Sequence, residues 1–260
     1  MDRYLIYDLG LHHGYDTEFY LNKGFKVIAL EANPAMILRA RKSTILADAE
    51  EDGRLGIVPM AFWHRGGESI SFYVNSTVDD YSSIEKVWAE KHAHESREIK
   101  VATISLDMMF EKLGVPYYIK CDIEGADEIF SAQLSAQSSL PAFVSCEASP
   151  KSDLRILEDL RAAGYDRFQI VNQARHHDVI PPNPPREGNH VETRFNGHMS
   201  GLFGLDLPLD RWISFDELHR QLSMYGELRR VRFPLTNAWF DIHATKTETL
   251  AAAARAAANA

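Results

Sequence analysis

Residues 4–34 read YLIYDLGLHHGYDTEFYLNKGFKVIALEANP and constrain the fold more than any other part of the chain. A short apolar run, Tyr4–Tyr7, leads into a glycine-containing turn, and a helical segment, Asp16–Lys23, follows and ends at Gly24. A second apolar run, Lys26–Leu30, completes the order strand, turn, helix, strand. Such a unit is a right-handed βαβ crossover in a parallel sheet, with a ligand-binding turn after its first strand.

The turn carries the side chains and glycines that we expect to bind a ligand. Asp8 ends the first strand, and Gly10 and Gly14 allow the backbone to approach a bound molecule closely. The free N–H groups of the following helix add hydrogen-bond donors. Glu31 comes about 20 residues after the first glycine, the spacing at which an acid binds ribose hydroxyls in such units.

The chemistry of this turn favours a cationic nucleoside over a dinucleotide. The pattern is D-x-G-x-x-x-G rather than G-x-G-x-x-G, and His12 and His13 occupy space that a pyrophosphate needs. Asp8 adds negative charge, which disfavours a phosphate but suits the ammonium and sulfonium of S-adenosylmethionine. Glu31 would bind the ribose of that donor. A nicotinamide cofactor is a weaker fit, and an ordinary tight turn without a ligand is the structural alternative.

Composition bounds the class of protein. The 260 residues are 45% hydrophobic and 25% charged, which suits one large α/β domain with an insertion. The net charge of −9 and the lack of a basic run disfavour a nucleic-acid substrate. We find no signal-peptide pattern and no apolar span of about 18 residues, so we expect a cytoplasmic protein with no membrane partner. Cys121 and Cys146 are expected to be buried, reduced thiols that lie close together if their strands are neighbours.

A second informative stretch, Tyr117–Asp127, runs from a strand into an acidic turn with glycine. In an open parallel sheet, ligands bind at the carboxyl ends of strands where the strand order reverses. Asp122 should therefore face Gly10 and a transferring methyl group, with Glu124 in the loop itself. Glu147 ends the next strand and brings a third acid to the same rim.

Other segments show strand or helix patterns that indicate secondary structure but say little about function. We expect strands at 56–63 (with Pro59 at an edge or bulge), 69–74, 100–105, 141–146, 165–171 and 239–244, and helices at 35–46, 85–97, 106–113, 127–132 and 153–163. Ala61 and Phe62 are candidates to flank an adenine ring, although simple core packing explains them equally well. Regular patterning is lost in residues 172–236, apart from a helix at 214–225 that Ser214 would cap. We interpret residues 1–250 as a single domain, 172–236 as a substrate-lid insertion and 251–260 as an alanine-rich tail, helical or disordered.

Four motifs, DLGLHHGYDT, VIALEANP, TISLDMMF and IKCDIEGADEIF, resemble the FkbM-like family of S-adenosylmethionine-dependent methyltransferases. The resemblance covers roughly residues 4–150. It implies a class I, Rossmann-like fold with a seven-stranded, mostly parallel sheet whose last strand is antiparallel, and O-methylation of a sugar or natural product. The chain departs from the family at Leu11 and His12, where a small residue and then Asn are common, so that polar contacts of the turn pass to His12. The cofactor-binding set that follows is Asp8, Gly10, His12, Gly14, Glu31, Ala32, Ala61, Phe62 and Asp122.

A hydroxyl acceptor must lose a proton, and a positioned base speeds this by roughly 10²–10⁴-fold. Asp122, Glu124 and His12 are the catalytic candidates, with His198 behind them. Each has a plainer alternative: a donor-orienting acid, a helix N-terminal acid and a hydrogen-bonded turn histidine, respectively. His243 should lie in the core, away from the ligand end of the sheet.

We predict no metal ligand set, since the acids at the rim are compatible with Mg²⁺ but their spacing does not require it. The substrate would be a small molecule, and the sequence leaves the oligomeric state open. The alternative function is a non-catalytic Rossmann-type nucleoside-binding or regulatory protein, which the unusual Leu11-His12 turn would also suit.

Overall fold

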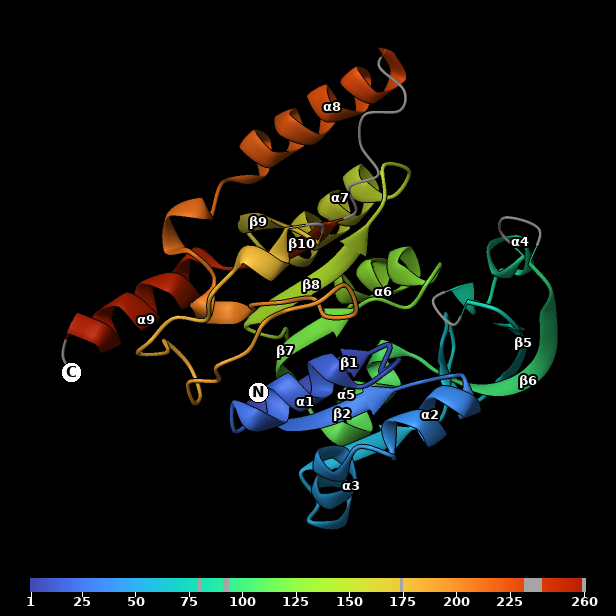
Figure 1. The fold of residues 1–260 in the computed structure, drawn as a ribbon. Helices are drawn as coiled ribbons and strands as arrows, with labels where there is room; N and C mark the ends of the chain where they lie inside the picture. The colour runs from blue at the N-terminus through green and yellow to red at the C-terminus, as the bar shows by residue number, and fades with distance from the viewer. Residues whose placement is uncertain (79–80, 91–93, 174, 232–239, 259–260) are drawn as a thin grey trace.

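Seven strands form the central sheet of the computed structural model, which describes all residues except 79–80, 91–93, 174, 232–239 and 259–260 (Figure 1). They are β1 (Asp2–Leu9), β2 (Lys26–Leu30), β3 (Leu55–Val58), β7 (Pro116–Cys121), β8 (Phe143–Ala148), β9 (Arg167–Asn172) and β10 (Phe240–Thr245). The strand order is β3-β2-β1-β7-β8-β10-β9. All pairs are parallel except those of β10, which runs antiparallel to both β8 and β9. The predicted class I architecture is confirmed.

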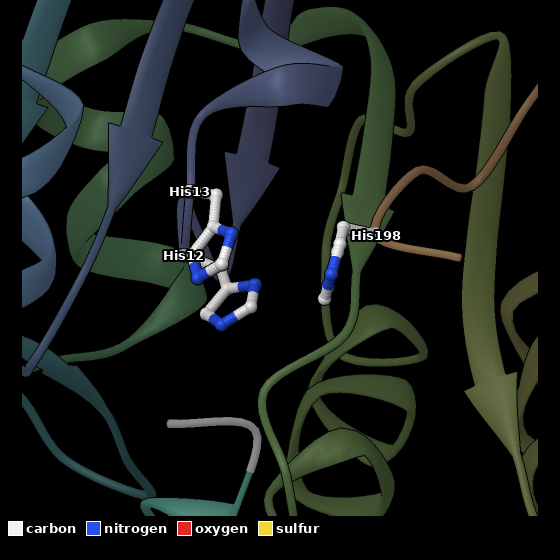
Figure 2. Close-up of side chains that lie close together, drawn as sticks. All are labelled: His12, His13 and His198. Carbon is white, nitrogen blue, oxygen red and sulfur yellow. The ribbon is translucent and has the colours of Figure 1, made fainter. Parts of the chain in front are cut away.

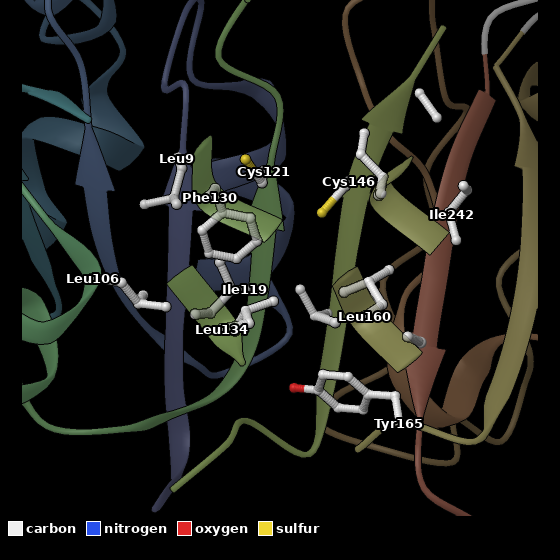
Figure 3. Packing of buried hydrophobic residues seen from close by; sticks show 14 of the residues in the cluster. Leu9, Leu106, Ile119, Cys121, Phe130, Leu134, Cys146, Leu160, Tyr165 and Ile242 are labelled. Atoms are coloured by element: carbon white, nitrogen blue, oxygen red, sulfur yellow. The ribbon is translucent and has the colours of Figure 1, made fainter. Parts of the chain in front are cut away.

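Alternation along the strands divides the interior into two cores, one on each face of the sheet. Leu5, Tyr7 and Leu9 of β1 join one cluster, while Ile6 between them joins the other. The first cluster packs the sheet against the helices α5 (Leu106–Leu113), α6 (Asp127–Leu134), α7 (Asp153–Ala163) and α8 (Phe215–Val231) (Figure 3). Cys121 and Cys146 are register partners in this core and are both free thiols, as expected from neighbouring strands.

The opposite face is covered by α1 (Tyr15–Asn22) together with part of the predicted insertion. Phe195, Phe203 and Trp212 of that segment are buried in the second cluster. The ring of Phe203 stacks on Tyr118 of β7, with ring centroids 4.8 Å apart. This irregular segment therefore covers the face of the sheet that a crossover helix covers elsewhere. Its aromatic side chains supply the apolar surface that packs against the strands.

Several predicted elements differ in extent from the observed ones. The helix expected at 35–46 is two helices, α2 (Pro34–Ala40) and α3 (Thr44–Glu51), because the Ser43 side chain accepts a hydrogen bond from the Leu46 N–H and begins a new helix. The helix expected at 85–97 is only α4 (Lys86–Ala89), and its residues 91–93 lie outside the described part. Ser96 and Arg97 instead enter a strand, since pairing with a neighbour overrides local helix preference.

The strand expected at 56–63 is also wrong, because it splits at Pro59 between two sheets. Residues 55–58 form β3 of the central sheet, and β4 (Ala61–Phe62) belongs to a separate sheet with β5 (Ser69–Asn75) and β6 (Ser96–Ile104). Proline has no N–H to donate to a ladder, which ends the pairing of β3 with β2. Figure 1 shows this second sheet projecting to one side of the central one.

At the C-terminal end, α8 extends further than the predicted 214–225, and the Ser214 hydroxyl accepts a hydrogen bond from the Glu217 N–H as expected of a cap. Residues 232–236 and Trp239 lie outside the described residues. Residues 251–258 of the alanine-rich tail belong to a helix, α9 (Thr247–Ala258). Among the helices that the structure describes, none combines the length and the apolar character needed to span a bilayer.

Two buried polar contacts attach the insertion to the sheet. The Lys23 ammonium lies 2.6 Å from an Asp206 carboxylate oxygen, and both side chains are almost fully buried. The Tyr117 hydroxyl donates a hydrogen bond to Glu187, whose other carboxylate oxygen is buried. Burial raises the pKa of Glu187 to about 8. The neutral carboxyl is thus the form that suits this site at neutral pH.

Replacing Glu187 by Gln is expected to stabilise the protein at alkaline pH. Because the folded-state pKa lies above the ordinary value, the contribution of Glu187 to stability is full at acidic pH and is lost as the pH rises towards about 8. Glu187→Gln should therefore raise the free energy of unfolding at pH 9 by roughly 1–2 kcal/mol and change it little at pH 5. Denaturant unfolding at both pH values checks this; an equal effect at both would contradict it.

Candidate functional site

A cavity of about 240 Å³ lies at the carboxyl ends of β1, β2 and β7. The predicted site residues that line it are Gly10, His12, Glu31, Ala32, Ala61, Phe62, Asp122 and Glu124. The structure thus brings together eight positions that are spread over more than 110 residues of sequence. Asp8 and Gly14, also predicted to bind the cofactor, are not among the residues that line it.

Gly10 allows the first turn to pass close to the end of β7. Its φ is +98°, and a Cβ atom there would lie 1.9 Å from the carbonyl oxygen of Asp122. The N–H groups of Gly10 and Leu11 both donate to the Leu30 carbonyl, each at 3.0 Å. The glycine is therefore required both by the left-handed backbone and by contact with a neighbouring main chain.

Glu31 is fixed by two backbone donors at the end of β2. The His12 N–H donates to one carboxylate oxygen at 2.9 Å, and the Asn33 N–H donates to the other at 2.7 Å. Burial raises the pKa of Glu31, and these two hydrogen bonds act against that rise. The remaining lone pairs of the carboxylate can accept hydrogen bonds from a pair of hydroxyls.

Asp8 does not line the cavity, but it contacts Lys120, which does. Its side chain is fully buried, accepts a hydrogen bond from Thr17 at 2.5 Å and lies 3.4 Å from the Lys120 ammonium. Gly14 also lies away from the lining, against Leu46 and Ala40, with φ at +82°. Asp8 and Gly14 therefore hold the turn in place from the side that faces away from the cavity.

Lys120 is the central site residue that the sequence reasoning missed. Its ammonium lies 3.4, 3.7 and 3.5 Å from carboxylate oxygens of Asp8, Asp16 and Asp122, and it donates to the Gly10 carbonyl at 3.2 Å. Burial acts to lower the pKa of Lys120, but the surrounding carboxylates outweigh it and hold the pKa well above the usual value. A lysine inside the apolar strand YYIKC was the available signal, since a buried charge needs partners.

Asp16 and Asp241 were also missed, and both line the cavity. Asp16 accepts hydrogen bonds from the Ser200 N–H at 2.9 and 3.0 Å, which ties the insertion to α1. Burial raises the pKa of Asp16 to about 6 and that of Asp241 well above its ordinary value. Asp241 reaches the site because β10 runs antiparallel to β8 and brings Asp241 opposite Glu147 in the register of the two strands.

Three acids converge on one rim of the cavity, as the sequence predicted for strand ends. One carboxylate oxygen from each of Asp122, Glu124 and Glu147 lies within 4.8 Å of the others. Glu124 has φ at +45° and accepts a hydrogen bond from the Trp88 indole at 2.8 Å. Burial, followed by the charge of Asp122, raises the pKa of Glu147 well above its ordinary value. The Glu147 carboxylate therefore has a higher proton affinity than an exposed glutamate.

The remaining predicted residues divide between the cavity and the core. Phe62 lines the cavity while its ring packs against Phe130, with centroids 5.7 Å apart, so it takes part in core packing. Its contact with an adenine ring stays a prediction. His198 lines the cavity from the insertion. His243 is buried on β10 and stacked over Tyr118, and burial lowers its pKa to about 3. The expectation of a core histidine is confirmed.

Comparison with known proteins assigns the family. Residues 8–167 match the Methyltransferase FkbM domain. The chain belongs to the FkbM methyltransferase family. This match includes both strand-end motifs that build the cavity, whereas the insertion and β10 lie outside it. No curated protein matches the sequence.

Solved structures resemble the chain only distantly. A precorrin-6Y C5,15-methyltransferase from Geobacter metallireducens is 11% identical, with a TM-score of 0.42 over 95% of this chain and 81% of that one. A putative methyltransferase from Thermoplasma acidophilum is 10% identical, with a TM-score of 0.40 over 94% and 68%. The N-terminal domain of EvdMO1 with SAH bound is 14% identical, with a TM-score of 0.33 over 92% and 72%. Likenesses at this level say nothing about the substrate.

Adding a methyl group at Gly10 is expected to disrupt the site far more than the same change at Gly53. Both glycines have positive φ, +98° and +78°, but a Cβ at Gly53 meets nothing within 4 Å. Gly53→Ala should cost about 1 kcal/mol of stability, and Gly10→Ala at least about 2 kcal/mol more, because the Asp122 main chain must move. Thermal unfolding of both variants tests this, and equal losses would contradict the close approach.

Proposed function

We propose that this chain transfers the methyl group of S-adenosylmethionine to a hydroxyl group of a small molecule. The acceptor class that we propose is a sugar or a natural product. The observation that carries the proposal is the charge of the cavity. Among its described lining residues, one ammonium, that of Lys120, stands against six carboxyl groups. A negative cavity favours a donor that carries a sulfonium and an ammonium. The acids concerned are Asp16, Glu31, Asp122, Glu124, Glu147 and Asp241.

The donor would lie along the ends of β1 and β2. Glu31, already oriented by two backbone N–H groups, would accept hydrogen bonds from the ribose hydroxyls. Ala32, Ala61 and Phe62 would contact the adenine, and the turn from Gly10 would lie against the methionine part. In this arrangement Asp8 and Gly14 position the turn without touching the donor. The sulfonium would lie towards Asp122, where β1 and β7 meet.

Methyl transfer is an in-line displacement, so the acceptor oxygen must lie about 3 Å from the methyl carbon. The oxygen–carbon bond forms as the carbon–sulfur bond breaks, and the sulfonium leaves as a neutral thioether. The acceptor hydroxyl gives its proton to a carboxylate of the group formed by Asp122, Glu124 and Glu147. Burial and the charges of Asp122 and Glu124 raise the pKa of Glu147, which makes its carboxylate a stronger base than an isolated one.

We infer that residues 1–250 work as one methyltransferase domain in which the segment 172–236 shapes the acceptor side. Four consecutive residues of that segment, Gly197–Ser200, line the cavity. The Ser200 N–H is held by Asp16, so the segment and the donor turn share a hydrogen-bonded contact. Acceptor selection would then depend on residues that lie outside the matched family region.

Removing the Glu31 carboxylate tests the donor site. Glu31→Ala is expected to weaken binding of S-adenosylmethionine and of S-adenosylhomocysteine alike, by roughly 10–100-fold, because both carry the same ribose and each hydrogen bond to a charged group contributes about 1.5–3 kcal/mol. Isothermal titration calorimetry measures this. Glu51→Ala, at an exposed helix end, is the matched control. Unchanged donor affinity in Glu31→Ala would count against the proposal.

Neutralising the rim acids separates catalysis from donor binding. Asp122→Asn and Glu124→Gln should each keep donor binding within about tenfold, and at least one should reduce the rate of methyl transfer by about 10²–10⁴-fold. The assay follows radiolabelled methyl transfer to panels of sugars, phenols and amines, with Asp48→Asn on the exposed face of α3 as the control. Donor binding without transfer to any panel member would favour a non-catalytic nucleoside-binding protein.

A further inference from the structure

Three histidine side chains meet beside the cavity, and the methyl-transfer proposal does not require them to act together. His12 and His13 come from the glycine turn, and His198 comes from the insertion, more than 180 residues later (Figure 2). The ring centroid of His13 lies 3.9 Å from that of His12 and 4.8 Å from that of His198. One ring nitrogen from each histidine lies within 4.8 Å of the others.

Backbone hydrogen bonds hold both segments in place before any ligand arrives. The His12 N–H is bound by Glu31, and His12 adopts φ of +48°, a left-handed conformation that bulky residues rarely adopt. The Gly14 N–H donates to the Leu11 carbonyl at 2.7 Å and closes the turn. On the other side, the His198 N–H donates to the Asn196 side chain at 2.9 Å. The conformation of this turn therefore fixes the positions of the His12 and His13 Cα and Cβ atoms.

The surroundings of the three rings favour a cation. His12 and His198 line the same cavity as the six carboxyl groups, so the local field is negative. Imidazole nitrogens are good ligands for Zn²⁺ and its neighbours among the transition metals, and poor ones for Mg²⁺ or Ca²⁺. Zinc–nitrogen bonds of about 2.0–2.1 Å require nitrogen separations of roughly 3.3 Å, so metal binding would draw the three nitrogens closer together than the 4.8 Å within which they now lie.

We propose that His12, His13 and His198 form a transition-metal site of the Zn²⁺ class, which joins the insertion to the glycine turn. Three protein ligands leave a fourth coordination position open, as in catalytic rather than structural zinc sites. Since His12 and His198 line the cavity, that position faces the cavity and suits an oxygen of the small-molecule acceptor. The binding claim stands without the proposed function; only the role towards the acceptor rests on it.

The competing explanation is an aromatic cluster that merely packs. Tyr15 belongs to the same group of rings, with its centroid 5.8 Å from that of His13 and 6.2 Å from that of His198. A packing cluster would lose stability on truncation but would bind no metal. The two explanations therefore differ in one measurable quantity, the affinity for a divalent transition metal.

The test uses the full chain, stripped with a chelator and titrated with Zn²⁺ in competition with a chromophoric chelator. We expect one equivalent to bind, and both His13→Ala and His198→Ala to weaken that binding by at least roughly 100-fold. His64→Ala, an exposed histidine outside the cavity lining, should bind as the unmodified chain does. Co²⁺ in place of Zn²⁺ should give the intense visible bands of a four-coordinate site, and these should be lost in His198→Ala.

Two controls keep the outcome decisive. Circular dichroism and thermal unfolding establish that each variant is folded, and His13→Ala leaves the cavity lining unchanged should His198→Ala fail to fold. Glu147→Gln asks whether the metal sits at the acidic rim instead. Absence of tight one-equivalent binding, or binding lost in Glu147→Gln and kept in both histidine variants, would overturn the proposal. Calorimetry with S-adenosylhomocysteine, with and without Zn²⁺, reports on the donor site separately.

Discussion

The buried ammonium of Lys120 is the interaction on which the rest of the site depends. It lies within 3.7 Å of carboxylates on three separate elements, β1, α1 and the loop after β7, and donates to the Gly10 carbonyl. A charge so deeply buried is tolerated only with such partners, and removing one side of a buried pair typically costs about 3–5 kcal/mol. The floor of the cavity is therefore one electrostatic unit, with the ends of two strands and the first turn of a helix held together.

The carboxylates around the cavity also bind backbone N–H groups of the insertion and of the glycine turn. Asp16, which pairs with Lys120, also accepts the Ser200 N–H, and Glu31 at the end of β2 accepts the His12 N–H of the glycine turn. The backbone of the glycine turn and that of the insertion are thus each held by a carboxylate that lines the cavity. A change in the protonation of Asp16 would affect both the floor of the cavity and the insertion, because Asp16 contacts the Lys120 ammonium and accepts the Ser200 N–H.

Acid-rich cavities serve a cationic donor, and they also make carboxylates better bases. These two consequences have one cause, the exclusion of water from several like charges. The family match covers the described lining residues from Gly10 to Glu147, whereas Gln173, Gly197–Ser200 and Asp241 lie outside it. In the proposed enzyme, donor chemistry would accordingly be set by the family motifs and acceptor choice by the insertion.

The sequence alone determined the βαβ unit, the strand-end acids and the burial of His243, because hydrophobic period, glycine turns and acids after strands are local signals. Glu31, Asp122 and Glu124 follow from them, since the carboxyl ends of parallel strands share an edge. Only the tertiary structure decided the partners of Lys120 and Asp241 and the meeting of His198 with His12 and His13. The contacts of Lys120 with Asp8 and Asp16, and of His198 with His12 and His13, join segments more than 100 residues apart. No local pattern encodes which buried charges or rings will meet once an irregular segment packs on the sheet.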